Sequence, residues 1–326
     1  MTNIKDVAKK AGVGIATVSR VINNSGYVKK ETRERIERVI KEISYIPNEI
    51  ARSMTRQKNN IVAFILPNST HLFFGELLYF VEKELFKYGY KVMICNSSES
   101  LEKELVYLDM LKNNRVDAVI LLTNNDIEKY LDKEMAVMSF DRRFSDVPFV
   151  ASDNYNGGVL AAKKLIESGC KKFMFIGDDA QGENTTVITE VSKRRIGYID
   201  YLKSKGYNDV VNIEYPLGNY MKIYDKVHDE IAKYPEVDGI FVISDAAACD
   251  VIKELVNRGK RVPEDIKVIG FDGGRSFINL GKRITSIGQS PKLIAKAIGE
   301  IIDSFYKNKT IENKIIPVYF QDGDTT

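Results

Sequence analysis

Two aspartates, Asp141 and Asp272, have the clearest potential for acid–base chemistry in this sequence. Each directly follows an apolar run typical of a buried strand, at 135–140 and 267–271. Open α/β sheets bind ligands beyond the carboxyl ends of their strands, so both side chains are candidates for one cleft. Two carboxylates across a cleft can act as a glycosidase pair. The chain has no dinucleotide-binding, P-loop or nucleophile-elbow motif, so we expect no enzyme and keep glycoside hydrolysis by Asp141 and Asp272 as a remote alternative.

Cysteine and histidine are too sparse for metal or disulfide chemistry. The three cysteines are far apart and form no CxxC pair, and His71 and His228 are the only histidines. This pattern argues against a zinc site or a disulfide framework and favours a reducing cytosol. No apolar run approaches the ~20 residues of a membrane span, and the first residues lack the apolar segment of a secretory signal. We therefore expect a cytoplasmic protein with no metal, no cofactor and no membrane contact.

Charge is distributed unevenly along the chain. The formal net charge is only +3, but residues 1–60 carry 13 Lys and Arg against 6 Asp and Glu. The rest of the chain is slightly acidic. A basic segment joined to a mildly acidic body indicates contact with a polyanion such as nucleic acid, although a solvated pair of basic helices would have the same composition.

Three short amphipathic helices are expected within the basic segment. The region 4–11 repeats apolar residues at helical spacing, and Gly12 follows it as a helix-ending residue. Helices are also predicted at 15–22 and 30–43, each with one apolar face. Two helices joined by a tight, glycine-containing turn are typical of a helix-turn-helix, so we predict an all-α head.

The remainder of the chain alternates apolar runs with amphipathic helices. We expect strands at 61–66, 91–95, 118–122, 135–140, 172–177, 239–244 and 267–271. Between and after them we expect helices at 74–88, 101–113, 157–168, 193–205, 246–258 and 291–306. Continuous apolar strands alternating with helices predict doubly wound parallel sheets covered on both faces. The region is too long for one small domain of this kind, so we predict two lobes.

Two motifs in the head identify a family. Residues 4–23 read IKDVAKKAGVGIATVSRVIN and residues 45–54 read YIPNEIARSM. In this order and separation they resemble the lactose/galactose repressor family of bacterial transcription regulators. The resemblance implies that the helix at 15–22 enters the major groove of operator DNA. It also implies a set of DNA-binding residues in and just after that helix, namely Ile15, Ala16, Thr17, Ser19, Arg20 and Asn23.

The segment 48–54 resembles the hinge helix of the same family. In that role Met54 replaces the usual leucine as an apolar wedge in the minor groove. Ala51 would lie at the contact between paired hinge helices, and Arg52 near phosphates. A segment this short is not a stable helix by itself, and the alternative is that it simply begins the following domain.

The body resembles the effector domain of the family, and through it the periplasmic sugar-binding proteins. The matching motifs include FDRR (140–143), RRIGY (194–198) and IGFDG (269–273). Aromatic faces suit sugar C–H groups, and charged side chains suit hydroxyls, through hydrogen bonds that contribute about 1.5–3 kcal/mol each. The resemblance implies an effector site formed by Phe73, Phe74, Asp141, Arg142, Arg194, Tyr220, Ser244, Asp272 and Gln289.

Together these patterns predict a homodimeric regulator that binds pseudo-palindromic double-stranded DNA. We expect a head with its hinge helix at 1–58 and a periplasmic-binding-protein-like core at 59–326. Within the core we expect one lobe at about 59–153 and 287–317, and the other at about 154–286 and 318–326. The resemblance implies a repressor of a carbohydrate-use operon whose operator affinity changes when a small sugar binds between the lobes. Corepression and control by a phosphoprotein partner remain alternatives within the family.

Overall fold

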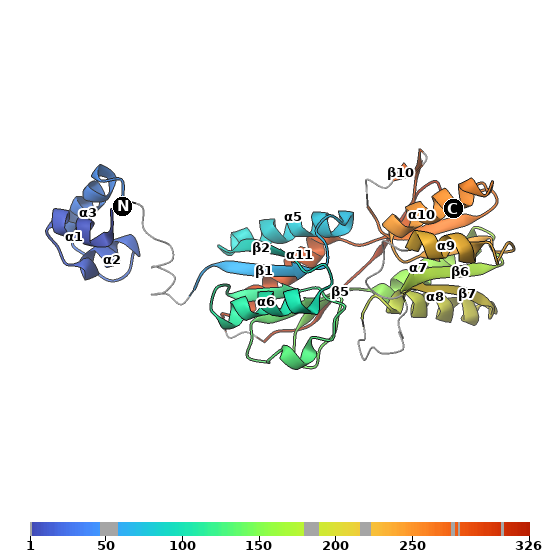
Figure 1. The fold of residues 1–326 in the computed structure, drawn as a ribbon, viewed down its shortest axis with the longest axis horizontal. Coiled ribbons are helices and arrows are strands. Elements are labelled where there is room, and N and C mark those ends of the chain that lie inside the picture. The colour runs from blue at the N-terminus through green and yellow to red at the C-terminus, as the bar shows by residue number, and fades with distance from the viewer. Residues whose placement is uncertain are drawn as a thin grey trace. The chain divides into compact units, whose positions relative to one another are not determined.

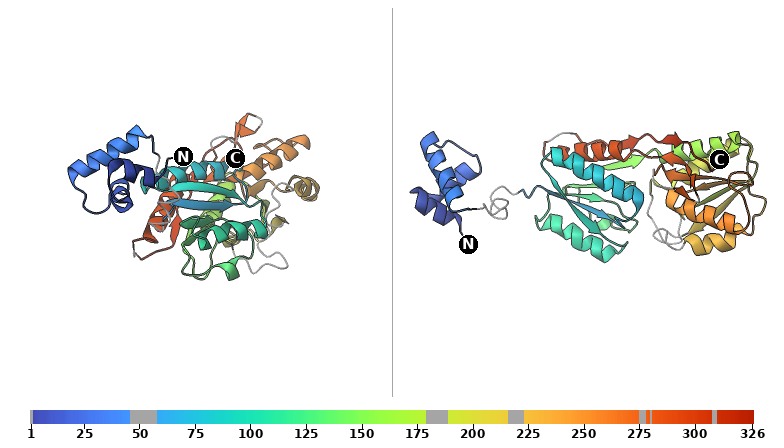
Figure 2. Two further views of the ribbon diagram at one scale, coloured as in Figure 1. Left: turned by 60° about the vertical axis from the view of Figure 1, so that its left-hand side comes forward. Right: turned by 90° about the horizontal axis from the view of Figure 1, so that it is seen from above.

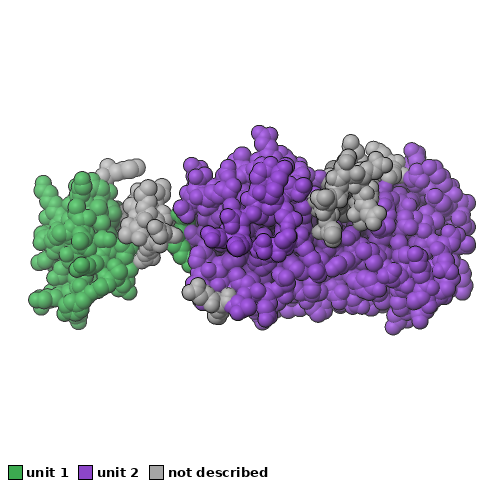
Figure 3. Space-filling model, turned by 90° about the horizontal axis from the view of Figure 1, so that it is seen from below, with its two compact units in different colours: residues 1–59 green, residues 60–326 purple. Residues whose placement is uncertain are grey.

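The chain consists of two compact units, residues 1–59 and 60–326 (Figure 3). The structure, a computed structural model, describes residues 2–45, 58–178, 189–215, 223–274, 278–279, 281–307 and 310–326. The expected hinge helix at 48–54 lies outside these ranges. No helix in the described ranges has the length and apolar character that a membrane crossing requires.

The first unit is an all-α head of three helices, as predicted. They are α1 (Ile4–Ala11), α2 (Ile15–Ile22) and α3 (Lys30–Glu42). Asn3 caps α1 by accepting hydrogen bonds from the backbone N–H groups of Lys5 and Asp6, and Gly12 ends the helix with a φ of 64°. A small apolar core holds the three helices together; its fully buried members include Val7, Val18 and Ile36.

The second unit contains two lobes, each built on a six-stranded sheet (Figure 1). In the first lobe the strand order is β13-β5-β4-β3-β1-β2, and all neighbours are parallel. The strands are β1 (Ile61–Leu66), β2 (Lys91–Asn96), β3 (Ala118–Leu121), β4 (Val137–Phe140), β5 (Phe149–Ser152) and β13 (Lys314–Ile316). Alternate residues of β1 enter two separate cores, which also contain buried residues of α5 (Leu72–Lys87), α11 (Pro291–Ser304) and α6 (Leu101–Lys112).

The second lobe has the order β14-β12-β9-β8-β6-β7, with only β14 antiparallel to its neighbour. The strands are β6 (Phe173–Asp178), β7 (Val210–Tyr215), β8 (Gly239–Val242), β9 (Lys267–Asp272), β12 (Thr285–Gly288) and β14 (Tyr319–Gln321); a small hairpin, β10 (Ile278–Asn279) with β11 (Lys282–Arg283), is separate. The helices that pack on this sheet are α7 (Asn154–Glu167), α8 (Lys193–Ser204), α9 (Ile223–Ile231) and α10 (Asp245–Asn257) (Figure 2).

The seven predicted strands are all present, but the strands that complete the sheets were not predicted. The additional members are β5, β7, β12, β13 and β14. Most of them are only three or four residues long and contain polar residues, so their strand character comes from pairing with an existing sheet rather than from local sequence. The chain crosses between the lobes three times, after β5, after β12 and between β13 and β14.

Two glycines allow α7 and α8 to pack backbone against backbone. A Cβ on Gly158 would lie 2.0 Å from the carbonyl oxygen of Arg194, and one on Gly197 would lie 2.0 Å from the carbonyl oxygen of Tyr155. Real Cβ atoms cannot approach a carbonyl oxygen so closely, and neither carbonyl can move without its helix. The absence of side chains at these two positions therefore fixes the place of Arg194 beside the start of α7.

We predict that Gly197→Ala destabilises the protein by about 1–3 kcal/mol or more, because the added methyl group must push the helices apart. Gly75→Ala is the matched control in α5, where the nearest atom is the Ser69 carbonyl oxygen at 3.6 Å. That change should instead stabilise by about 0.5–1 kcal/mol, as expected for Gly to Ala in a helix. Urea unfolding curves of both variants test this; equal stability of the two would show that the helix contact is not tight.

Candidate functional site

Helix α2 of the head presents one exposed face. Val18 and Val21 are buried in the head core, whereas Ile15 is 44% exposed although it is a large apolar residue. Ala16 and Arg20 are also exposed. This face carries an apolar residue and the small Ala16 at the start of the helix, followed by the long cation Arg20, an arrangement that fits close approach to a DNA groove.

The other predicted DNA-binding residues differ in how well they can be placed. Thr17, Ser19 and Asn23 are partly buried, and the Asn23 side chain donates a 3.1 Å hydrogen bond to the Ser19 hydroxyl. The hinge residues lie outside the described part of the chain; they are Ala51, Arg52 and Met54.

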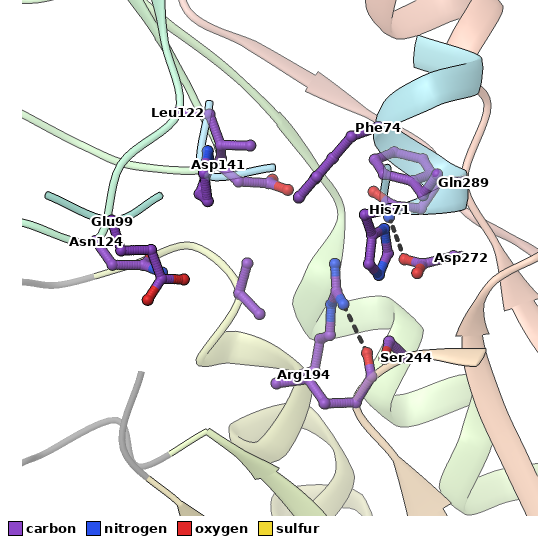
Figure 4. A pocket seen from close by; sticks show the side chains of 14 residues that line it. His71, Phe74, Glu99, Leu122, Asn124, Asp141, Arg194, Ser244, Asp272 and Gln289 are labelled. Carbon is purple, nitrogen blue, oxygen red and sulfur yellow. Dashed lines mark hydrogen bonds between the residues drawn. The ribbon is translucent and has the colours of Figure 1, made fainter. Parts of the chain in front are cut away.

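A cavity of about 150 Å³ lies between the two lobes of the second unit. It is lined by residues that follow strands or begin helices in both lobes, namely Pro67, His71, Phe73, Phe74, Glu99, Leu122, Asn124, Asp141, Val191, Arg194, Ile243, Ser244, Asp272 and Gln289. In Figure 4, Asp141 and Asp272 lie on opposite sides of Arg194. The predicted effector residues Phe73, Phe74, Asp141, Arg194, Ser244, Asp272 and Gln289 thus come together in one cavity.

Arg194, on the first turn of α8, is the cation of this cavity and is only 5% exposed. Its Nε donates to the Asn154 side chain at 2.7 Å, and its Nη1 donates to the Ile243 carbonyl oxygen at 2.8 Å. The guanidinium carbon lies 3.6 Å from the centre of the Phe271 ring, within cation–π range. Arg194 lines the cavity with a planar guanidinium, which carries five N–H donors and no acceptor.

The two aspartates have strained backbones at the strand ends. The φ of Asp141 is 55° and that of Asp272 is 107°, values that residues other than glycine rarely adopt. Strained backbone conformations of this kind persist only where the surrounding structure holds them in place, and they cluster at ligand-binding sites. Asp272 Oδ1 accepts a 2.8 Å hydrogen bond from Gln289 Nε2, and Asp141 Oδ1 accepts from the Ser152 backbone N–H at 3.3 Å.

Burial dominates the ionisation of both acids. It raises the pKa of Asp141 to about 6, although Arg194 and hydrogen bonds from Ser152 and Asn154 lower it. Burial also raises the pKa of Asp272, against the lowering effects of Arg194, His71 and Gln289. The cavity therefore holds carboxyl groups that gain from any ligand hydroxyl able to donate to their charged form.

Arg142 is a correction to the sequence-based expectation, because it does not line the cavity. Its side chain is buried on the other side of the strand end, where Nη1 donates to the carbonyl oxygens of Thr123, at 3.2 Å, and Asn125. The guanidinium also lies 4.5 Å from the Phe144 ring centre. Tyr220, another predicted effector residue, lies outside the described part of the chain.

The cavity also includes residues that sequence reasoning did not select. Glu99 and Asn124 lie at the opposite end of the cavity from Asp272 (Figure 4). They follow β2 and β3, so their position after apolar strands was the available signal. His71 also lines the cavity, with its ring centre 4.8 Å from that of Phe74. In the described residues, no group of three or more His, Cys, Asp or Glu side chains could hold a metal ion.

The fold and the site together define a class of protein in which a DNA-binding head is joined to a two-lobed core with a polar ligand cavity. Comparison with known proteins gives the family. Residues 3–48 match the model of bacterial regulatory proteins of the lacI family, and residues 59–322 match that of periplasmic binding proteins and the sugar-binding domain of the LacI family. The chain belongs to the LacI family of bacterial transcription regulators.

The relatives include regulators of two kinds of sugar operon. The chain is 36% identical to the ribose operon repressor of Bacillus subtilis and 32% identical to the sucrose operon repressor of Streptococcus mutans, in each case over 100% of this chain and 99% of the relative. Among solved structures, the Lac repressor dimer bound to operator and the anti-inducer ONPF is similar with a TM-score of 0.83 at 19% identity, over 100% of this chain and 99% of that one.

We predict that Asp141→Asn stabilises the ligand-free protein at pH 7.5. A carboxyl whose pKa rises from 3.8 to about 6 on folding favours the folded state at low pH. That contribution is lost as the pH rises from about 4 to about 6. The neutral amide avoids a penalty of about 3 kcal/mol at pH 7.5. Urea unfolding of both proteins at pH 4 and 7.5 measures this difference in stability. An Asn variant that is no more stable than the native protein at pH 7.5 would contradict the raised pKa of Asp141.

Proposed function

We propose that this chain acts as a cytoplasmic homodimeric repressor of a carbohydrate-use operon. Its operator would be a pseudo-palindrome, read by one head of each subunit. A small neutral sugar bound in the cavity would change its operator affinity, with no enzymatic step. The observation that carries the proposal is the meeting of Asp141, Arg194 and Asp272, all nearly fully buried, at one cavity.

The cavity chemistry favours a polyhydroxylated ligand. Arg194 offers N–H donors, and Asp141 and Asp272 offer acceptors, so neighbouring hydroxyls can each find a partner. Phe74 lines the same cavity and offers an apolar face for C–H groups. The relatives are named for ribose and sucrose operons, so D-ribose and sucrose are the first sugars to test. We do not propose hydrolysis by Asp141 and Asp272, because the family consists of regulators and both acids face the same guanidinium.

Ligand contacts from both lobes supply the means of regulation. Phe74 and Asp141 belong to the first lobe, whereas Arg194 and Asp272 belong to the second. A sugar that binds all four residues favours the arrangement of the lobes that brings them nearest. For this to control transcription, operator and sugar must prefer different arrangements. The change in lobe arrangement would then alter how the DNA-binding residues, including Ala51, Arg52 and Met54 of the hinge segment, contact the operator.

The homodimer is supported by an exposed apolar stripe on the first lobe. Leu72, Tyr79 and Phe86 recur at seven-residue intervals along α5, and each is at least half exposed. Ile94, on the edge strand β2, is also half exposed. Large apolar residues gathered in this way mark association surfaces. The structurally similar Lac repressor was solved as a dimer, and a second copy of this chain is the occupant we propose.

We predict that Asp272→Asn separates sugar binding from operator binding. The amide keeps the side-chain shape but loses the charged acceptor, so sugar affinity should fall about 10- to 100-fold. Operator affinity without sugar should remain within about twofold of the native value. Calorimetry with D-ribose and sucrose, beside operator titrations on a site selected from random DNA, gives both quantities.

Two control variants complete this experiment. Asp109→Asn makes the same chemical change on the exposed face of α6 and should alter neither affinity. Arg20→Ala should weaken operator binding by about 1–3 kcal/mol while sugar binding is unchanged. Unchanged sugar affinity in Asp272→Asn would remove this cavity as the effector site, and loss of operator binding in the same variant would show a structural role.

A further inference from the structure

Asn154 occupies a central place behind the cavity without lining it. It is the first residue of α7, two residues after β5 ends and the chain crosses between the lobes. Only 1% of the residue is exposed. Its position is fixed from the other side by the tight contact of α7 with α8 at Gly158.

The amide of Asn154 connects the acid of one lobe to the guanidinium of the other. Its Oδ1 accepts a 2.7 Å hydrogen bond from Arg194 Nε, while its Nδ2 donates to Asp141 Oδ1 at 3.4 Å and to the Ser152 carbonyl oxygen at 3.0 Å. The orientation of the amide follows from its neighbours. A guanidinium can only donate and a carboxylate can only accept, so the reversed amide would face both with the wrong atoms.

We propose that Asn154 is a positioning residue for effector binding, which holds Asp141 and Arg194 in register across the two lobes and keeps Asp141 ready to accept a hydroxyl. The proposal rests on the proposed sugar site and adds a residue that never touches the sugar. An amide can hold both groups because it offers a donor for Asp141 and an acceptor for Arg194 at the same buried point.

The charges around Asp141 define what a change at Asn154 should do. Arg194 on α8 favours the ionised form, and Glu190, just before α8, opposes it. Asp272 and His71 face Arg194 from the other side of the cavity. The Asn154 hydrogen bond is one of the few contributions that lower the Asp141 pKa against burial. Replacing its NH₂ by a carboxylate oxygen removes that donor and adds a negative charge beside Asp141.

Asn154→Asp is the sharpest test because it is isosteric. Sugar affinity of the native protein should rise through a midpoint near pH 6, where Asp141 ionises, and then level off. In Asn154→Asp the midpoint should move up by at least one pH unit. Affinity at pH 6 should therefore fall at least fivefold and recover to within about twofold of the native value by pH 9. D-ribose and sucrose are the probes, measured by calorimetry with the full chain.

Three further variants separate positioning from mere structure. Asn156→Asp makes the same change on the exposed side of α7 and should leave the midpoint in place. Asn154→Ser, which adds no charge, should weaken binding with a smaller shift. In an Asp141→Asn background, Asn154→Asp should produce no shift, because the group it acts through is gone. An equal loss of affinity at every pH, or no loss at all, would overturn the proposal.

A ligand-free measurement keeps this test independent of the sugar assignment. The unfolding free energy should decline between about pH 4 and the pH at which Asp141 ionises in the folded protein. In Asn154→Asp the upper end of that decline should move to higher pH by the same interval as the binding midpoint. If neither sugar binds but the unfolding profile shifts, the proposed effector is wrong and the positioning role stands. If a sugar binds and neither profile shifts, the positioning role is wrong and the proposed function stands.

Discussion

The burial of three charged side chains at the junction of the two lobes is the constraint on which the core depends. Asp141, Arg194 and Asp272 are each at most 6% exposed, and charges removed from water need partners. The partners come mainly from the segments that cross between the lobes. Ser152 and Asn154 flank the first crossing, and Gln289 lies on the second. The same short segments thus join the lobes and compensate the charges.

This arrangement explains why a ligand can act on the whole core. Gln289 donates to Asp272 and accepts from the Ser152 hydroxyl, which belongs to the other lobe. Asn154 joins Asp141 to Arg194 in the same manner. A sugar that forms hydrogen bonds with these charged groups alters contacts that lie directly on the crossing segments. Relative movement of the lobes is then a natural consequence of binding, because the crossings are the connections that such movement must bend.

Local sequence was sufficient to predict some elements and site residues of the molecule and insufficient to predict others. Apolar residues at helical spacing within 4–11, 15–22 and 30–43 predicted the head, and apolar runs predicted the central strands, because both patterns reflect burial of one face or of a whole strand. Strands β12 and β13 were missed because neighbouring strands, rather than their own residues, make them strands. Arg142 was assigned to the cavity beside Asp141, but consecutive residues at a strand end point to different sides. Glu99 was missed because its position after β2 indicates a strand end but does not indicate that its loop reaches the cavity.

The most direct test of this account is the reciprocal effect of sugar and operator on each other. Titrating the full chain with its operator, with and without a saturating cavity-binding sugar, gives the factor by which the sugar changes operator affinity. Titrating it with the sugar, with and without operator, gives the factor by which the operator changes sugar affinity. Linkage requires the two factors to be equal, and a coupling of about 1–3 kcal/mol corresponds to roughly 5- to 150-fold. We predict equal factors in this range. Operator affinity that is independent of a sugar bound in the cavity would contradict the account.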